Sequence, residues 1–167
     1  MLRYRPIDIR KDRQVLLVIH CQINYASETS EVRKTSYEEY WEKWMRSPQP
    51  EQFLSHLGET IKENRAVAEI VHDEHGAIVG YLWVTFEDIE GYNTRVAQVM
   101  DIAVLSDFRG HGVGTEIMHH IEDVARVKGA RLLRSDTGIE NEASQKLHEK
   151  LGFKPYHILY EKDLRES

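Results

Sequence analysis

Residues 109–114 read Arg-Gly-His-Gly-Val-Gly and separate an aliphatic, β-branched run at 96–105 from a long amphipathic stretch at 113–128. This order predicts a strand, a glycine loop and a helix. Glycines let the backbone approach a ligand closely, and the first turn of a helix presents unpaired N–H groups and the positive end of its dipole. The stretch therefore predicts an anion site, with phosphate or pyrophosphate as the expected ligand.

The glycine spacing excludes two other phosphate-binding motifs. A dinucleotide fingerprint, G-x-G-x-x-G, would need glycine where Thr115 or Ile117 stands. A Walker-type loop would need a lysine before its Ser or Thr, but Gly114 directly precedes Thr115. On this loop alone, a tight strand-to-helix turn without a ligand remains the alternative.

Composition limits the class of protein. The chain has 167 residues, which is enough for one domain with a core, so we expect a single domain over residues 1–167. Its net charge of −6 disfavours nucleic acid as a partner. Cys21 is the only cysteine, so no internal disulfide can form, and we find neither a signal core nor an apolar run of membrane-spanning length. We therefore expect a cytoplasmic protein that binds no membrane.

Hydrophobic periodicity and turn residues predict alternating strands and helices. Strands are expected over residues 2–8, 65–72, 77–86, 95–105, 131–135 and 153–160, and helices over 10–26, 37–45, 51–64, 113–128 and 141–151. The run at 78–84 is apolar on both faces, which places it in the middle of a sheet. The element order predicts a mixed α/β layer with helices on the faces of the sheet.

Four segments resemble the GNAT family of acyl-CoA-dependent N-acetyltransferases in order and spacing. They are Gly80-Tyr81, Asp101-Ile102-Ala103-Val104, Arg109–Gly114 and the stretch from Asn141 to Phe153. The resemblance covers residues 77–155, whereas residues 1–64 match by element order alone. It implies an α+β fold with a mixed, mostly antiparallel sheet of six to seven strands and helices on both faces. It further implies an acceptor side at 1–64 and a cofactor-binding core at 65–161.

The resemblance also implies which residues bind acetyl-CoA. Ile102, Ala103 and Val104 would belong to a splayed strand whose backbone pairs with the pantetheine arm. The pyrophosphate would lie on Arg109, Gly110, His111, Gly112, Val113, Gly114 and Thr115. Asn141 would lie near the cofactor, although a simple helix cap explains it equally well.

The implied chemistry is direct attack of an amine on the thioester, which needs a base for the ammonium and benefits from an acid for the leaving thiolate. His148 stands where many family members carry a tyrosine acid, and an imidazolium could protonate the thiolate. A surface helix residue is the alternative. Asp101 is the candidate base and could attract a cationic acceptor. Its alternatives are pairing with Arg95 or Arg131, or deprotonation through water.

The acceptor site is the least specified part of the sequence. Trp41 and Trp44 belong to an aromatic helical stripe that is either core packing or the wall of a cation site, with Glu87 as a nearby acidic partner. The nine histidines show no metal-ligand spacing, so we expect no metal.

We therefore expect an acetyl-CoA-dependent N-acetyltransferase that acts on a primary amine, favouring a small molecule over a protein lysine or N-terminus. A homodimer is compatible with the family. The alternative class is a non-catalytic acyl-CoA sensor or interaction module, which the missing tyrosine keeps open.

Overall fold

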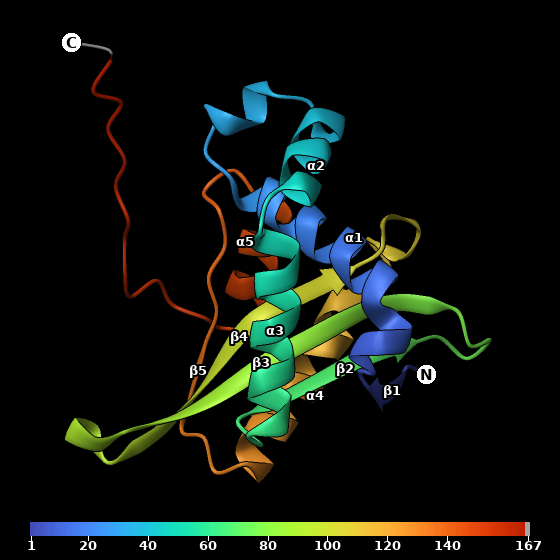
Figure 1. Ribbon diagram of the computed structural model, residues 1–167. Coiled ribbons are helices and arrows are strands. Elements are labelled where there is room, and N and C mark those ends of the chain that lie inside the picture. The colour runs from blue at the N-terminus through green and yellow to red at the C-terminus, as the bar shows by residue number, and fades with distance from the viewer. Residues whose placement is uncertain (166–167) are drawn as a thin grey trace.

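A computed structural model describes residues 1–165. The chain forms β1 (Arg3–Pro6), α1 (Ile9–Ser27), α2 (Tyr37–Arg46), α3 (Gln49–Lys62), β2 (Ala66–His72), β3 (Ile78–Ile89), β4 (Thr94–Val104), α4 (Val113–Val127), β5 (Leu132–Arg134) and α5 (Glu142–Lys150), with short 3-10 turns at Val32–Lys34, Glu90–Tyr92 and Ser106–Phe108. Figure 1 shows these elements, with the β3–β4 hairpin extending beyond the other strands.

The five strands form one sheet in the order β1-β2-β3-β4-β5. All neighbours pair antiparallel except β4 and β5, which are parallel. The central place of β3 confirms the prediction from its two-sided apolar run. The fold class is confirmed, although the described sheet has five strands rather than six or seven.

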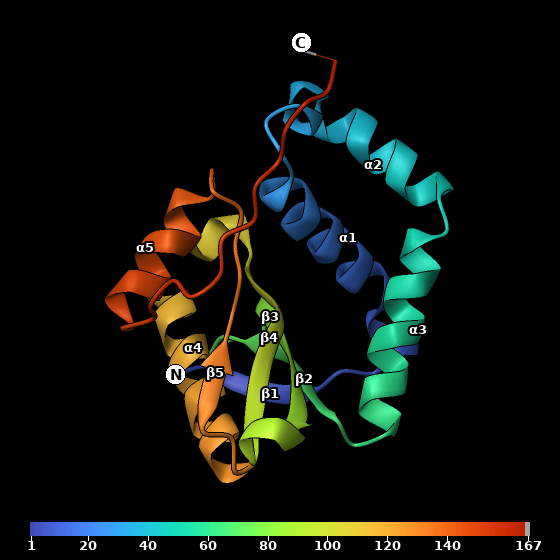
Figure 2. The same ribbon diagram turned by 90° about the vertical axis from the view of Figure 1, so that its left-hand side faces the viewer.

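Helices cover both faces of the sheet. Figure 2 shows α1 and α3 on one side and α4 and α5 on the other. Successive side chains of β3 point to opposite faces, so Tyr81 and Trp83 join the core under α1–α3, whereas Leu82 and Val84 join the core under α4. The outcome is two cores that share one sheet.

The aromatic stripe of α2 mostly packs into the first of these cores. Trp44 is buried there, and Tyr37, Tyr40 and Trp41 are partly buried against it. The Tyr40 hydroxyl also donates to Glu28 at 3.0 Å. Core packing thus accounts for most of the stripe.

The strand expected over residues 153–160 is not formed, and that prediction was wrong. The segment is extended but pairs with no described strand, and Ile158, Leu159 and Tyr160 are exposed. A strand exists only where a partner edge accepts its backbone hydrogen bonds, and a local pattern does not specify that edge. We call residues 153–165 the C-terminal arm.

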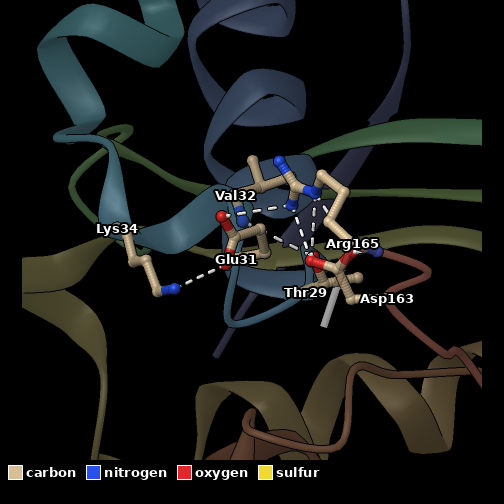
Figure 3. A network of polar contacts seen from close by, with 6 residues as sticks. All are labelled: Thr29, Glu31, Val32, Lys34, Asp163 and Arg165. Atoms are coloured by element: carbon tan, nitrogen blue, oxygen red, sulfur yellow. Dashed lines mark hydrogen bonds and ion pairs between the residues drawn. The ribbon is translucent and has the colours of Figure 1, made fainter. Parts of the chain in front are cut away.

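The C-terminal arm leads away from the sheet and stands apart from α1 in Figure 1, and it ends on the side of the turn that precedes α2 (Figure 2). Near its end, Arg165 pairs with Asp163 at 2.7 Å and with Glu31 at 3.5 Å (Figure 3). The Arg134 guanidinium lies over the Tyr156 ring, with 5.0 Å between its central carbon and the centre of that ring. These exposed contacts hold the arm weakly.

Among residues 1–165, no helix combines the length and the apolar character that a bilayer span requires.

Candidate active site

Strands β4 and β5 diverge partway along the sheet. Their last paired residues are Gln98 and Arg134, whereas β4 continues to Val104 and stays paired with β3 on its other side. The backbone of Ile102, Ala103 and Val104 therefore lies beyond the last β4–β5 pair. This gap gives a linear ligand a strand edge to bind, as predicted for a splayed cofactor strand.

Gly80 permits the close approach of β3 and β4 at this position. A Cβ built on Gly80 would lie 2.0 Å from the carbonyl oxygen of Ala103, which no side chain tolerates. The glycine of the Gly80-Tyr81 pair thus has a steric role beside the strand edge.

The glycine loop connects β4 to α4. Gly110 and Gly112 have φ values of +78° and +82°, a region that disfavours any residue with a Cβ, and neither added Cβ would meet a protein atom within 4 Å. Gly112 is the N-cap of α4 and no side chain caps the helix, so the first-turn N–H groups of Val113, Gly114 and Thr115 have no side-chain cap. The loop is an open cradle for an anion.

Two cationic side chains border this cradle differently. Arg109 folds back and donates from Nε to the Val104 carbonyl at 2.9 Å, which ties the loop to the end of β4. Lys150 of α5 donates to the Thr115 hydroxyl at 3.4 Å. Lys150 lies within the Asn141–Phe153 segment, for which the sequence predicts no diphosphate-binding role. Its place beside the first turn of α4 supplies positive charge where an anion would bind.

Helix α5 packs against the loop. A Cβ on Gly114 would meet the Leu147 side chain at 3.4 Å. Asn141 caps α5, because its side chain accepts a hydrogen bond from the Ser144 N–H at 3.3 Å. The cap interpretation of Asn141 is confirmed, whereas its role near a cofactor stays a prediction.

His148 lies on α5, partly buried, with its ring edge against Phe153. Nδ1 is 2.7 Å from the Ser144 carbonyl oxygen, and Nε2 is buried without a partner among the described residues. A carbonyl can only accept, so Nδ1 carries a proton. Nε2 can then donate only when the ring is an imidazolium, the form that a general acid requires.

Asp101 is buried within the diverging part of β4. Its carboxylate lies 2.7 Å from Nδ1 of His20 in α1 and accepts a hydrogen bond from the Tyr81 hydroxyl of β3. Pairing with Arg95 does not occur, since Arg95 pairs with Asp88. Burial, followed by the Asp101 charge, raises the pKa of Tyr81 well above its ordinary value. The sequence identifies Tyr81 only within the Gly80-Tyr81 segment and does not identify His20, because nothing local in the chain links either side chain to Asp101.

The predicted acceptor residues are not brought together. Trp44 is buried in the core, and Trp41 lines a shallow groove between α1 and α2. Glu87 lines a different cleft of about 560 Å³ on the α3 face of the sheet, which reaches Met100, the chain neighbour of Asp101. Within residues 1–165, His, Cys, Asp and Glu side chains do not gather in threes that could hold a metal ion.

Comparison with known proteins supports the same interpretation. The chain is 30% identical over 74 residues to N-alpha-acetyltransferase 30 of Schizosaccharomyces pombe, a match that covers 44% of this chain and 49% of that protein. It is 29% identical over 99 residues to an aminoglycoside N(6')-acetyltransferase type 1 of Salmonella typhimurium, covering 58% of this chain and 68% of that protein. The chain thus spans about half the length of several curated relatives that it matches.

Solved structures share the fold over almost the whole chain. The putative acetyltransferase YycN of Bacillus subtilis superposes with a TM-score of 0.74 at 20% identity, covering 98% of this chain and 99% of that chain. A predicted acetyltransferase of Clostridium acetobutylicum, crystallised with acetyl-CoA, gives a TM-score of 0.70 at 17% identity, covering 100% and 99%. The model of the acetyltransferase (GNAT) family matches residues 29–153. We conclude that the chain belongs to the GNAT acetyltransferase family, because this match agrees with the splayed strand and the glycine cradle.

Proposed function

We propose that this protein transfers the acetyl group of acetyl-CoA to a primary amine of a small molecule. The observation that carries the proposal is the free backbone edge of β4, which leads directly into the open cradle at the start of α4. GNAT enzymes use acetyl-CoA, and relatives bear names of acetyltransferases for aminoglycosides and for protein N-termini. A cradle of backbone amides next to a strand edge suits a ligand with a diphosphate and an extended amide-bearing arm.

In this proposal the cofactor follows the order of the chain. Backbone groups of Ile102, Ala103 and Val104 pair with the pantetheine amides, and the amides of residues 109–115 bind the diphosphate. Lys150 adds charge at the diphosphate, and Asn141 lies at the end of α5 nearer the thioester. Bound acetyl-CoA supplies an activated acyl carbon and a thiolate leaving group.

The acceptor is proposed to approach along the cleft on the α3 face. This cleft contains Glu87 at its rim and Met100 next to Asp101. Arg65, Arg95 and Lys128 line the same cleft as Glu87 and Asp88, so the field of the cleft does not by itself select for a cation. We favour an amine over a hydroxyl acceptor because the relatives bear the names of N-acetyltransferases.

His148 is proposed as the acid that protonates the leaving thiolate. Replacing it with phenylalanine keeps an aromatic ring against Phe153. The variant loses the hydrogen bond from Nδ1 to the Ser144 carbonyl but also removes the buried Nε2 that has no partner, so we expect little net change in stability. We expect His148→Phe to lower kcat roughly 100-fold or more, the usual contribution of a general acid, while acetyl-CoA binding is retained. Unchanged turnover would remove His148 from the mechanism.

Release of free thiol from acetyl-CoA, measured with a panel of alkyl amines, aminoglycosides and N-terminal peptides, tests the function itself. We expect turnover with at least one small amine and weaker turnover with peptides. Tight acetyl-CoA binding without thiol release from any acceptor would refute the enzyme and indicate a sensor. A preference for peptides would refute the small-molecule assignment alone.

A further inference from the structure

Two histidine–carboxylate pairs lie on opposite faces of the sheet. His20 meets Asp101 on the α1 face, and His120 meets Glu69 on the α4 face, each at 2.7 Å. Both rings are stacked, His20 on Phe53 and His120 on Tyr4, with 3.7 Å between ring centres. Only the His20 pair lies beside the diverging part of β4, so the two pairs have the same chemistry in different places.

The geometry fixes which nitrogen of His20 is free. An ionised carboxylate only accepts hydrogen bonds, so Nδ1 of His20 carries the proton that faces Asp101. Nε2 then holds a lone pair. No described residue bonds to it, and the side chain keeps 15% of its surface exposed. A histidine held by a carboxylate through one nitrogen, with the other nitrogen free, is the arrangement of a general base.

The neighbours of His20 are less suited to that task. Asp101 is 5% exposed, and one of its oxygens already accepts from both His20 and Tyr81. The raised pKa of Tyr81 keeps its hydroxyl protonated, so it donates to Asp101 rather than accepting a proton. The other aromatic groups around His20, Phe53 and Trp44, carry no charge.

We propose that Nε2 of His20 takes the proton from the acceptor ammonium, and that Asp101 and Tyr81 are positioning residues that hold its ring. The inference rests on the proposed function. It changes the role of Asp101 from base to orienting carboxylate. Since an alkyl ammonium has a pKa of about 10.4, it must lose this proton before it can attack near neutral pH.

The ammonium gives one proton to Nε2 and becomes a neutral amine. Its nitrogen forms a bond to the thioester carbonyl carbon, and the carbon–sulfur bond breaks with its electron pair on sulfur. The nitrogen then loses a second proton while the thiolate gains one. Acetyl-CoA and an ammonium thus yield an amide, free CoA thiol and one proton released to solvent.

His20→Asn tests the base while sparing its anchor, because the asparagine amide can still donate to Asp101 from about the position of Nδ1. We expect kcat/KM near pH 7 to fall roughly 100-fold and the rising acid limb of its pH profile to disappear. The matched control is His120→Asn, which removes a ring in an equivalent pair away from β4. It should leave both the rate and the acid limb unchanged.

A second acceptor separates a base from a structural residue. The assay compares the best alkyl amine of the panel with an analogue that carries a trifluoromethyl group on the amine-bearing carbon, which makes the nitrogen mostly neutral at pH 7. The His20→Asn defect should shrink at least tenfold with the analogue, because no proton has to be removed before attack. Equal defects with both amines would overturn the proposal.

Asp101→Asn provides a second test should His20→Asn fold poorly. It should lower kcat with little change in acetyl-CoA affinity, and its defect should also shrink with the fluorinated amine. The proposed function and the role of His20 can be refuted separately. If the wild-type protein transfers to no amine, the proposed function falls and this inference with it. If it transfers and His20→Asn keeps the acid limb, only the inference falls.

Discussion

Replacing Gly112 with alanine should separate the stability of the fold from binding of the cofactor. Gly112 has a φ of +82° at the first turn of α4, and an added Cβ would meet no protein atom within 4 Å. The folding cost is therefore conformational, about 1–2 kcal/mol for a left-handed alanine. The methyl group would project into the open cradle.

The effect on binding follows from the hydrogen bonds at risk. One bond between a backbone amide and a charged oxygen contributes about 1.5–3 kcal/mol. Displacing the diphosphate enough to lose one such bond should raise the Kd for CoA roughly 10- to 100-fold. Isothermal calorimetry measures this Kd, and urea unfolding measures the stability.

The matched control is Gly129→Ala, at the opposite end of α4. Gly129 has a φ of +79° and equally open surroundings. Both variants should lose similar stability, but only Gly112→Ala should lose CoA affinity. Equal CoA affinities in the two variants would refute the assignment of the loop as the diphosphate site.

Three further perturbations concern the fold. Asp12→Asn should cost about 2 kcal/mol in urea unfolding at pH 7, since the buried carboxylate accepts two hydrogen bonds from Arg5, and these bonds lower its pKa. A carboxyl whose pKa is lower in the folded state adds stability above its unfolded pKa, near 4, and that stability is lost as the pH falls through the folded pKa. The free energy of unfolding of Asp12→Asn should therefore depend less on pH in this acid range than that of the wild type. Gly80→Ala should cost at least about 3 kcal/mol, because its methyl would overlap the Ala103 carbonyl oxygen. Glu31→Ala should leave the midpoint of thermal unfolding unchanged but speed proteolysis of the C-terminal arm, since its ion pair with the arm is exposed.

These perturbations have controls of similar chemistry. Asp88 accepts two hydrogen bonds from Arg95 but is exposed, so Asp88→Asn should change stability far less than Asp12→Asn. Gly91→Ala places its methyl in open space and should be tolerated, unlike Gly80→Ala. The packing described above would be contradicted if Asp12→Asn were as stable as Asp88→Asn or if Gly80→Ala were stable. It would also be contradicted if Glu31→Ala had a clearly lower midpoint of thermal unfolding.

Short-range features of the fold were predictable. Helices α1–α5 and strands β1–β5 lie where apolar periodicity and turn residues placed them, because each pattern reflects a face that must be buried. The exception is the segment at 153–160. Its apolar residues have strand character, but whether a strand forms depends on an edge elsewhere in the chain.

Local sequence was sufficient to identify the glycine loop and its position between β4 and α4, and this loop together with three further segments indicated the family and the expected cofactor. Such features depend on residues adjacent in the chain, whose φ preferences and helix ends are local properties. The environment of Asp101 depends instead on how α1 and the sheet pack together. Its partner His20 is 81 positions away on another element, and the pair exists because α1 packs across the sheet at that point. Contacts of this kind arise from packing between whole elements, which no local pattern encodes.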